Sequence, residues 1–100
     1  MSDDLTPDYV EGDVNEVAGP LAPLSTDVLR YLASALADEP DAVRIDVSRR
    51  HDKVVLALTV GAEDMGRIIG RRGRTAQAIR AMVAAAGARE GVTTSVDIVD

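Results

Sequence analysis

The sequence predicts an α+β domain in which a three-stranded sheet is covered on one face by three helices. The chain has 100 residues, of which 46% are hydrophobic, so it can build one small packed core. Apolar residues recur once with a helical period, twice with a strand period, twice more with a helical period and finally with a strand period. Each segment has one apolar face, and packing helices onto one side of a sheet buries these faces together.

The first predicted helix covers residues 24–37. Its apolar positions lie at helical spacing and are Leu24, Val28, Leu29, Leu32 and Leu36. Residues 38–40 have the sequence Asp-Glu-Pro, and we expect them to end this helix.

Two strands are predicted next, and they form a hairpin. The first alternates apolar and polar residues from Val43 to Val47. In the second, the buried face is expected to be made by Val54, Leu56, Leu58 and Val60. The polar residues 49–53 between them are predicted to be the turn. We interpret His51 in this turn as a solvated residue, because one histidine without cysteine provides too few ligands for zinc.

The second half of the chain predicts two helices and a strand. A short helix is expected to end near residue 69, and the sequence Gly-Arg-Arg-Gly follows at residues 70–73. The next helix carries an apolar stripe that includes Met82, which we expect to fill the core. Two glycines bracket its end, and residues 92–98 then alternate as the last strand.

Residues 1–22 are predicted to be an acidic, disordered tail, and residues 23–100 to be the folded domain. The first 16 residues contain six acids and no lysine or arginine. They account for the whole net charge of −6, because the other 84 residues hold 11 acids and 11 bases. The folded domain is therefore formally neutral.

The composition excludes several classes of function. The absence of cysteine removes disulfides, zinc fingers and thiol catalysis, and the absence of Phe and Trp argues against aromatic base-stacking platforms. The sequence shows no nucleotide-binding glycine motif and no assembled catalytic triad, so we expect no enzymatic activity, no cofactor and no metal. It shows no membrane-spanning run and no secretory signal, so we expect a cytoplasmic protein.

The turn at residues 70–73 is the most informative motif. Glycine allows a tight turn and the close approach of another backbone. A helix that begins after such a turn offers its N–H groups and the positive end of its dipole to an anion. Five arginines lie between residues 67 and 80, where there is no acid. This chemistry favours contact with a phosphate backbone.

The run from Glu63 to Thr75, followed by Ala-Ile-Arg at residues 78–80, resembles the signature of a KH domain. The predicted order of elements resembles the type II KH arrangement, in which the extra helix and strand precede the core. Residues 24–99 are similar to small bacterial single-KH proteins of the KhpA (YlqC) type. The resemblance implies a type II KH fold and the binding of single-stranded RNA without catalysis.

The resemblance also implies roles for the residues of the turn. In KH domains the Gly-x-x-Gly loop clamps the backbone of about four nucleotides. Gly70 and Gly73 would permit the turn and the close approach of RNA. Arg71 and Arg72 would reach phosphates.

Residues on either side of the turn complete the expected RNA-binding set. The helix that begins at Arg74 and Thr75 would present backbone N–H groups to the RNA. Ile68 and Ile69 would line an apolar floor for the bases, and we expect one of them to lie mostly in the core. Arg67 would contact phosphate or pair with an acid one turn back.

By the same resemblance, the chain is expected to form a homodimer or to pair with a larger KH protein of the KhpB (Jag) type. Members of the family are linked to RNA chaperoning, post-transcriptional regulation and cell shape. The alternative is that the fold is mainly a dimerisation or adaptor module with weak RNA binding of its own. For the acidic tail, one hypothesis is electrostatic competition with RNA for the arginine loop, and the alternative is a solvated tail that aids solubility.

Overall fold

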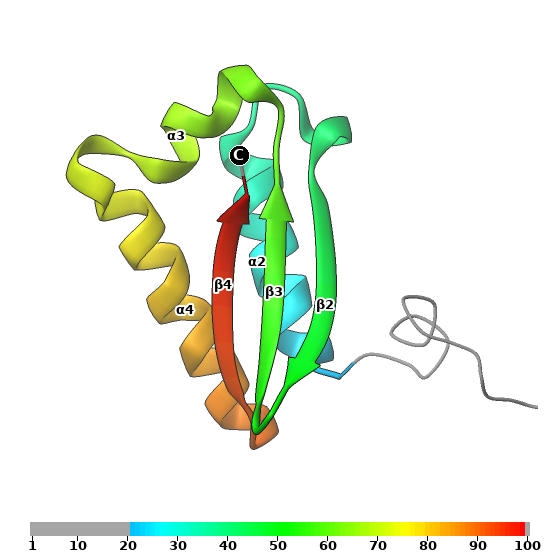
Figure 1. Cartoon of the computed structure of the whole chain (residues 1–100). Coiled ribbons are helices and arrows are strands. Elements are labelled where there is room, and N and C mark those ends of the chain that lie inside the picture. The colour runs from blue at the N-terminus through cyan, green and yellow to red at the C-terminus, as the bar shows by residue number, and fades with distance from the viewer. Residues whose placement is uncertain (1–20, 100) are drawn as a thin grey trace, which may run out of the picture.

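The computed structural model describes residues 21–99, which form a three-stranded sheet with helices on one face (Figure 1). The first half contains α2 (Pro23–Leu36), a 3₁₀ turn (Pro40–Ala42), β2 (Arg44–Arg50) and β3 (Lys53–Thr59). A second 3₁₀ turn (Ala62–Asp64) leads into α3 (Met65–Ile69). A third 3₁₀ turn (Arg71–Gly73), α4 (Arg74–Glu90) and β4 (Thr93–Val99) complete the order. The predicted α+β fold and its order of elements are confirmed.

β3 is the central strand of the sheet, which has the order β2-β3-β4. β2 pairs with β3 in the antiparallel sense, through a tight hairpin, whereas β3 and β4 are parallel. A parallel pair needs a long crossover, and α3 and α4 provide it. The crossover places the Gly-Arg-Arg-Gly turn between two helices, beyond the edge of the sheet that β4 forms (Figure 1).

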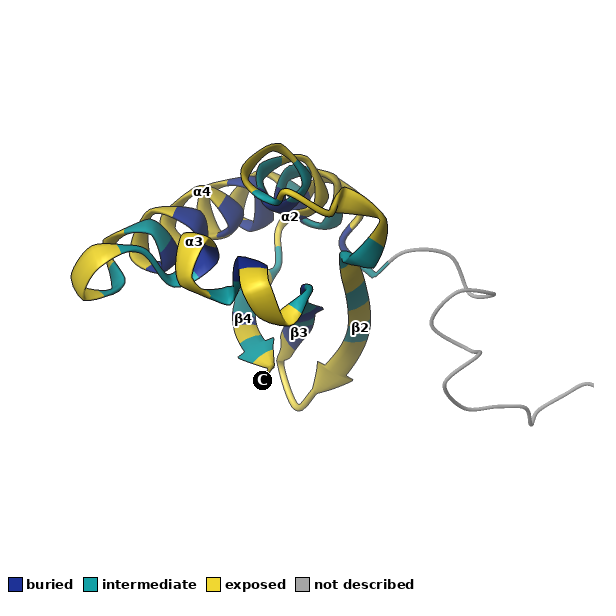
Figure 2. Ribbon diagram, turned by 90° about the horizontal axis from the view of Figure 1, so that it is seen from above, coloured by how far each residue is buried: buried dark blue, intermediate teal, exposed yellow. Residues whose placement is uncertain are grey.

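The core lies between the sheet and the long helices. α2 and α4 cover the same face of the sheet, and α3 continues this layer at one end (Figure 2). Leu56 on β3 is opposite Val47 on β2 and Val96 on β4, so one row of apolar side chains crosses the sheet on this face. Leu29 from α2 and Val83 from α4 pack onto this sheet face and are fully buried. Burial of each such side chain stabilises the fold by about 1.5–3 kcal/mol.

The N-terminal end of α2 is capped by a side chain from the far end of α4. The carboxylate of Glu90 accepts hydrogen bonds from the N–H groups of Leu24 and Ser25, each at 2.8 Å, and from Ser25 Oγ at 2.7 Å. Burial, the largest influence, raises the pKa of Glu90, but these hydrogen bonds together outweigh it and hold the pKa below its ordinary value. Glu90 thus replaces the missing local cap and ties α4 to α2.

Three sequence-based predictions are corrected. The hairpin turn is shorter than expected, because Arg49 and Arg50 belong to β2 and Lys53 to β3. Met82 does not fill the core but is 53% exposed, since α4 turns the face that carries it away from the sheet. Ala22, assigned to the tail, is fully buried and belongs to the packed region. Leu21, also assigned to the tail, is partly buried against the same core. Residues 1–20 of the predicted tail lie outside the described residues.

No helix within residues 21–99 is both long enough and apolar enough to cross a membrane.

Candidate nucleic-acid interface

Gly70 holds a backbone conformation that suits only glycine. Its φ of 76° and ψ of 173° lie in a region that other residues essentially do not adopt. A Cβ atom added there would also lie 2.6 Å from Thr75 Cβ and 2.8 Å from the Thr75 backbone nitrogen. The start of the turn therefore packs directly against the first turn of α4, where Thr75 leaves no room for a side chain on Gly70.

The second half of the turn is left-handed at two successive residues. Arg72 has φ 58° and ψ 25°, and Gly73 has φ 75° and ψ 12°. Gly73 N–H donates to the carbonyl of Gly70 at 3.1 Å and closes the turn. No atom lies within 4 Å of a Cβ built on Gly73, so this glycine is required for its backbone angles and not for space. The left-handed backbone at Arg72 costs about 1–2 kcal/mol, and its charged side chain is exposed.

The charged side chains of the loop are open to solvent. Arg71, Arg72 and Arg74 are all exposed, and within residues 21–99 none of them forms an ion pair. No side chain in the described part of the chain caps the N-terminus of α4 at Gly73. Three exposed arginines thus lie in the four residues that lead into the positive end of a 17-residue helix.

Arg67 lies near this region but has protein partners. Its Nη2 donates to Asp38 Oδ2 at 3.0 Å, and its Nε lies 3.8 Å from Asp64 Oδ1. The Arg67 side chain is 56% exposed, so RNA could still reach it. The sequence raised two alternatives for Arg67, contact with phosphate or pairing with an acid one turn back. The structure shows the pairing with an acid, and the contact of Arg67 with phosphate stays a prediction.

Asp64, the residue before α3, is a buried carboxylate that links two segments of the chain near Arg67. It is buried, and its carboxylate accepts the N–H groups of Asp38 and Glu39, each at 3.0 Å. These two bonds lower the pKa of Asp64 most, and Arg67 lowers it further, while burial acts in the opposite direction. Asp64 thereby ties the loop after α2 to the start of α3.

The two isoleucines before the turn have different environments. Ile68 is fully buried, in the core cluster that also contains Ile79, and offers no surface to a base. Ile69 is only partly buried. The expectation that one would belong to the core is thus confirmed for Ile68, and Ile69 is the remaining candidate for an apolar contact with RNA.

Arg80 has a role that the sequence did not reveal. Its Nε donates to the backbone carbonyl of Val96 at 3.2 Å and joins α4 to the strand β4. A contact between residues on a helix and on a strand 16 positions later has no signature in sequence periodicity. Arg80 is therefore a structural link rather than a free member of the arginine cluster.

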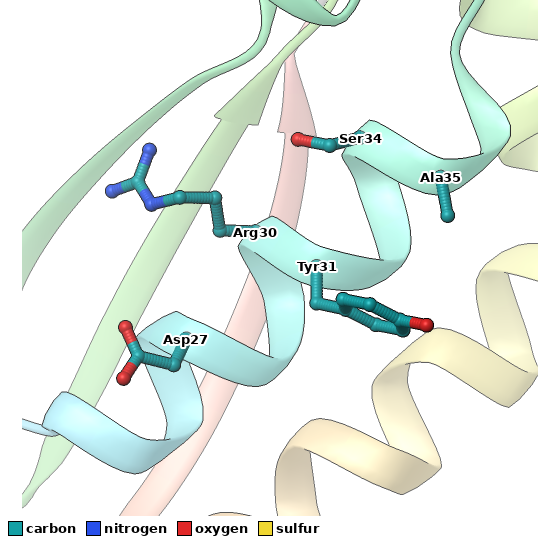
Figure 3. A pocket seen from close by; sticks show the side chains of 5 residues that line it. All are labelled: Asp27, Arg30, Tyr31, Ser34 and Ala35. Carbon is teal, nitrogen blue, oxygen red and sulfur yellow. The ribbon is translucent and has the colours of Figure 1, made fainter.

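A separate hollow of about 440 Å³ lies on α2 (Figure 3). It is lined by Asp27, Arg30, Tyr31, Ser34 and Ala35. All five residues come from one helix, so the hollow is part of an open helix surface and does not assemble a nucleophile with a base. Within residues 21–99, no group of histidine and acidic residues could hold a metal ion.

Comparisons with known proteins agree with this arrangement. The family described as KhpA/KhpB, KH domain, matches residues 26–98. A protein of Caldanaerobacter subterraneus subsp. tengcongensis named RNA-binding protein KhpA is 41% identical over 73 residues, which cover 73% of this chain and 97% of that protein. Its namesakes from Clostridium perfringens and Bacillus subtilis are both 36% identical, over 73% and 74% of this chain and 97% and 91% of theirs.

Solved structures show the same fold in a larger protein. A variant of Aquifex aeolicus Era bound to GDP·AlF4⁻ aligns with a TM-score of 0.56 and 19% identity, over 79% of this chain and 30% of the Era chain. Era in complex with MgGDPNP and nucleotides 1506–1542 of 16S ribosomal RNA aligns with a TM-score of 0.55 and 18% identity, over 98% of this chain and 35% of that one. At this identity the likeness concerns the fold alone. The family match and the relatives together show that this chain belongs to the KhpA/KhpB KH-domain family.

Proposed function

We propose that the chain is a non-catalytic protein that binds single-stranded RNA through the loop at residues 70–73 and the N-terminus of α4. The observation that carries the proposal is the group of three exposed arginines on a glycine turn that opens a long helix. The names of the relatives, which describe RNA binding and no reaction, support it.

The loop matches the demands of a phosphate backbone. Backbone N–H groups at a helix start and guanidinium groups are both donors that phosphate oxygens accept well. A Cβ at Gly73 would meet no protein atom within 4 Å, so the absence of a side chain there leaves open space into which a nucleotide backbone can approach closely. KH domains clamp about four nucleotides in this way, and Ile69 would contact a base beside them.

The proposal predicts binding that is steeply sensitive to salt. The described domain is nearly neutral overall, so its affinity depends on the local field of the loop rather than on net charge. For single-stranded nucleic acid, each neutralised phosphate contributes about −0.7 to the slope of log K against log salt concentration. Loss of two phosphate contacts should therefore flatten the slope by about 1.4.

The test is a salt series measured by fluorescence anisotropy with a mixed single-stranded RNA. The variant Arg71→Asp/Arg72→Asp is compared with Arg30→Asp/Arg44→Asp, which makes the same charge change at two exposed arginines outside the loop. Circular dichroism checks that both variants fold. Loss of binding and of salt slope only in the loop variant supports the proposal, whereas equal losses in both would contradict it.

A second candidate function is that of a dimerisation or adaptor module, and one observation favours it. Met82, Leu24, Val28 and Ala85 border an apolar hollow of about 450 Å³ between α2 and α4, with Arg89 at its rim. Met82 and Leu24 are 53% and 40% exposed. Such a surface fits a homodimer contact or a contact with a larger KH protein of the KhpB (Jag) type.

The two candidate functions use different surfaces and can therefore be separated. Met82→Asp should break assembly, seen by analytical ultracentrifugation, and leave the affinity of the monomer for a short RNA intact. The opposite result would be unchanged RNA binding in Arg71→Asp/Arg72→Asp and loss of RNA binding in Met82→Asp. RNA binding would then depend on assembly and not on the loop, and the adaptor would be the primary function. Participation in RNA chaperoning, post-transcriptional control and cell shape, in the cytoplasm, is proposed on the family membership alone.

A further inference from the structure

A second basic cluster lies at the closed end of the β2–β3 hairpin. It consists of Arg49, Arg50 and Lys53, with His51 and one acid, Asp52, in the turn between them, and all five residues are exposed. The hairpin end and the Gly-Arg-Arg-Gly loop are at opposite ends of the molecule (Figure 1). The loop therefore does not account for these charges.

Two of these cations directly face one another. Arg50 and Lys53 are partners in the antiparallel ladder, so their side chains project from the same face of the sheet. Like charges at directly opposite positions destabilise a sheet. No carboxylate within residues 21–99 lies within ion-pair distance of either one. A bound anion would remove this repulsion.

The surrounding face supplies further donors, with one apolar residue, Val55, between the two serines of the neighbouring row. Arg50 and Lys53 lie on the side of the sheet opposite to α2 and α4, which no described element covers (Figure 2). Thr93 on β4 is the next partner in their row, and Ser48 and Ser95 occupy the neighbouring row of the same face. Arginine, lysine, serine and threonine are the side chains that contact phosphate oxygens in nucleic-acid complexes.

The same face becomes acidic farther from the hairpin. Asp46 on β2 and Asp97 on β4 both pair with Ala57, one row beyond the serines. Their charges would repel an anion, so the surface that suits one is confined to the hairpin end. The face thus has a defined basic patch, formed by Arg50, Lys53 and Thr93 with Ser48 and Ser95 beside it.

We infer that this patch is a second contact site for the phosphate backbone of the same RNA strand. The inference rests on the proposed function, because it extends RNA binding from the loop to a second surface. α4 has 17 residues and so spans about 25 Å between the loop and the hairpin end. With about four nucleotides held at the loop, a short RNA has too few nucleotides left to reach the hairpin end as well. Only a longer strand can contact both sites.

The test compares a 5-nucleotide and a 20-nucleotide single-stranded RNA by fluorescence anisotropy. Arg50→Gln/Lys53→Gln is the test variant, and Arg30→Gln/Arg44→Gln is the control with the same charge change. The test variant should bind the 5-mer as the unaltered chain does, which also shows that it is folded. Its affinity for the 20-mer should fall roughly tenfold or more at 0.1 M salt, and its salt slope by about 1.4, because two phosphates are no longer neutralised.

Other outcomes separate the second site from the proposed function. Unchanged affinity for the 20-mer in the test variant, with the loop variant inactive, would overturn the second site and leave the proposed function standing. Equal losses for both RNA lengths, or for test and control variants, would also overturn it. Failure of the unaltered chain to bind either RNA would overturn both. Binding of poly-L-glutamate to the unaltered chain that is lost in Arg50→Gln/Lys53→Gln, while this variant binds RNA normally, would assign the patch to an acidic protein. That result would refute the inference.

Discussion

Replacing the two loop glycines by alanine should affect the fold very differently. At Gly73 the cost is only the left-handed backbone, about 1–2 kcal/mol, because a Cβ there meets no atom within 4 Å. At Gly70 there are two costs. The backbone conformation, which essentially only glycine adopts, costs about 1–3 kcal/mol. In addition, a Cβ would lie only 2.8 Å from the Thr75 nitrogen and would clash with it. Overpacking of that kind costs about 1–3 kcal/mol. We therefore expect Gly70→Ala to cost about twice as much as Gly73→Ala.

Asparagine refines this comparison, since it tolerates the left-handed region better than alanine does. The expected order of stability is Gly73→Asn, then Gly73→Ala, then Gly70→Ala. Urea unfolding followed by circular dichroism gives the three free energies of unfolding. Equal costs for the two alanine variants would refute the reasoning, because the two glycines would then not differ in their surroundings.

Three further predictions concern residues outside the loop. Glu90→Gln should cost about 0.5–2 kcal/mol, the usual range for a lost helix cap. Because hydrogen bonds depress the Glu90 pKa below its ordinary value of 4.5, its contribution should be complete above that pH and be lost as pH falls through the depressed pKa. Urea unfolding at several pH values should thus show the two proteins converging in acid; a pH-independent difference would contradict the role of its charge. Arg80→Ala should lower the free energy of unfolding by about 1 kcal/mol, measured by calorimetry, because the hydrogen bond to the Val96 carbonyl is lost. In an RNA titration, its affinity for RNA should change less than that of Arg71→Ala. Met82→Gln should change stability by no more than about 0.5 kcal/mol in thermal unfolding, because its side chain is largely exposed; a cost typical of a core position would restore the sequence-based expectation.

The sequence predicted most of the fold because local periodicity determined the elements. The alternation in residues 43–47, the apolar residues 54–60 and the helical spacing from Leu24 to Leu36 each appear in the structure as elements with a buried face, although Leu24 and Leu36 themselves are exposed. Met82 was misplaced because a narrow stripe on an alanine-rich helix does not define which of two adjacent faces turns toward the sheet. The hairpin turn was predicted too long because charged residues at a strand end resemble those of a loop.

The candidate site was predictable as a segment but not as a set of contacts. Two glycines three residues apart, among arginines, indicated the turn and the helix start at Arg74. The contacts of Arg67 with Asp38, of Asp64 with residues 38 and 39 and of Arg80 with Val96 join positions far apart in the chain. These depend on how α2, α3 and β4 pack together, which periodicity does not encode.

The central claim, that the Gly-Arg-Arg-Gly loop holds RNA, is tested most directly by nuclear magnetic resonance. Backbone amide shifts of the ¹⁵N-labelled protein would be followed during titration with a 5-nucleotide single-stranded RNA. If RNA binds at the loop, the largest shifts fall at residues 69–76, with the amides of Thr75 and Ala76 among them. Shifts concentrated on the outer faces of α2 and α4, with residues 69–76 unchanged, would contradict it.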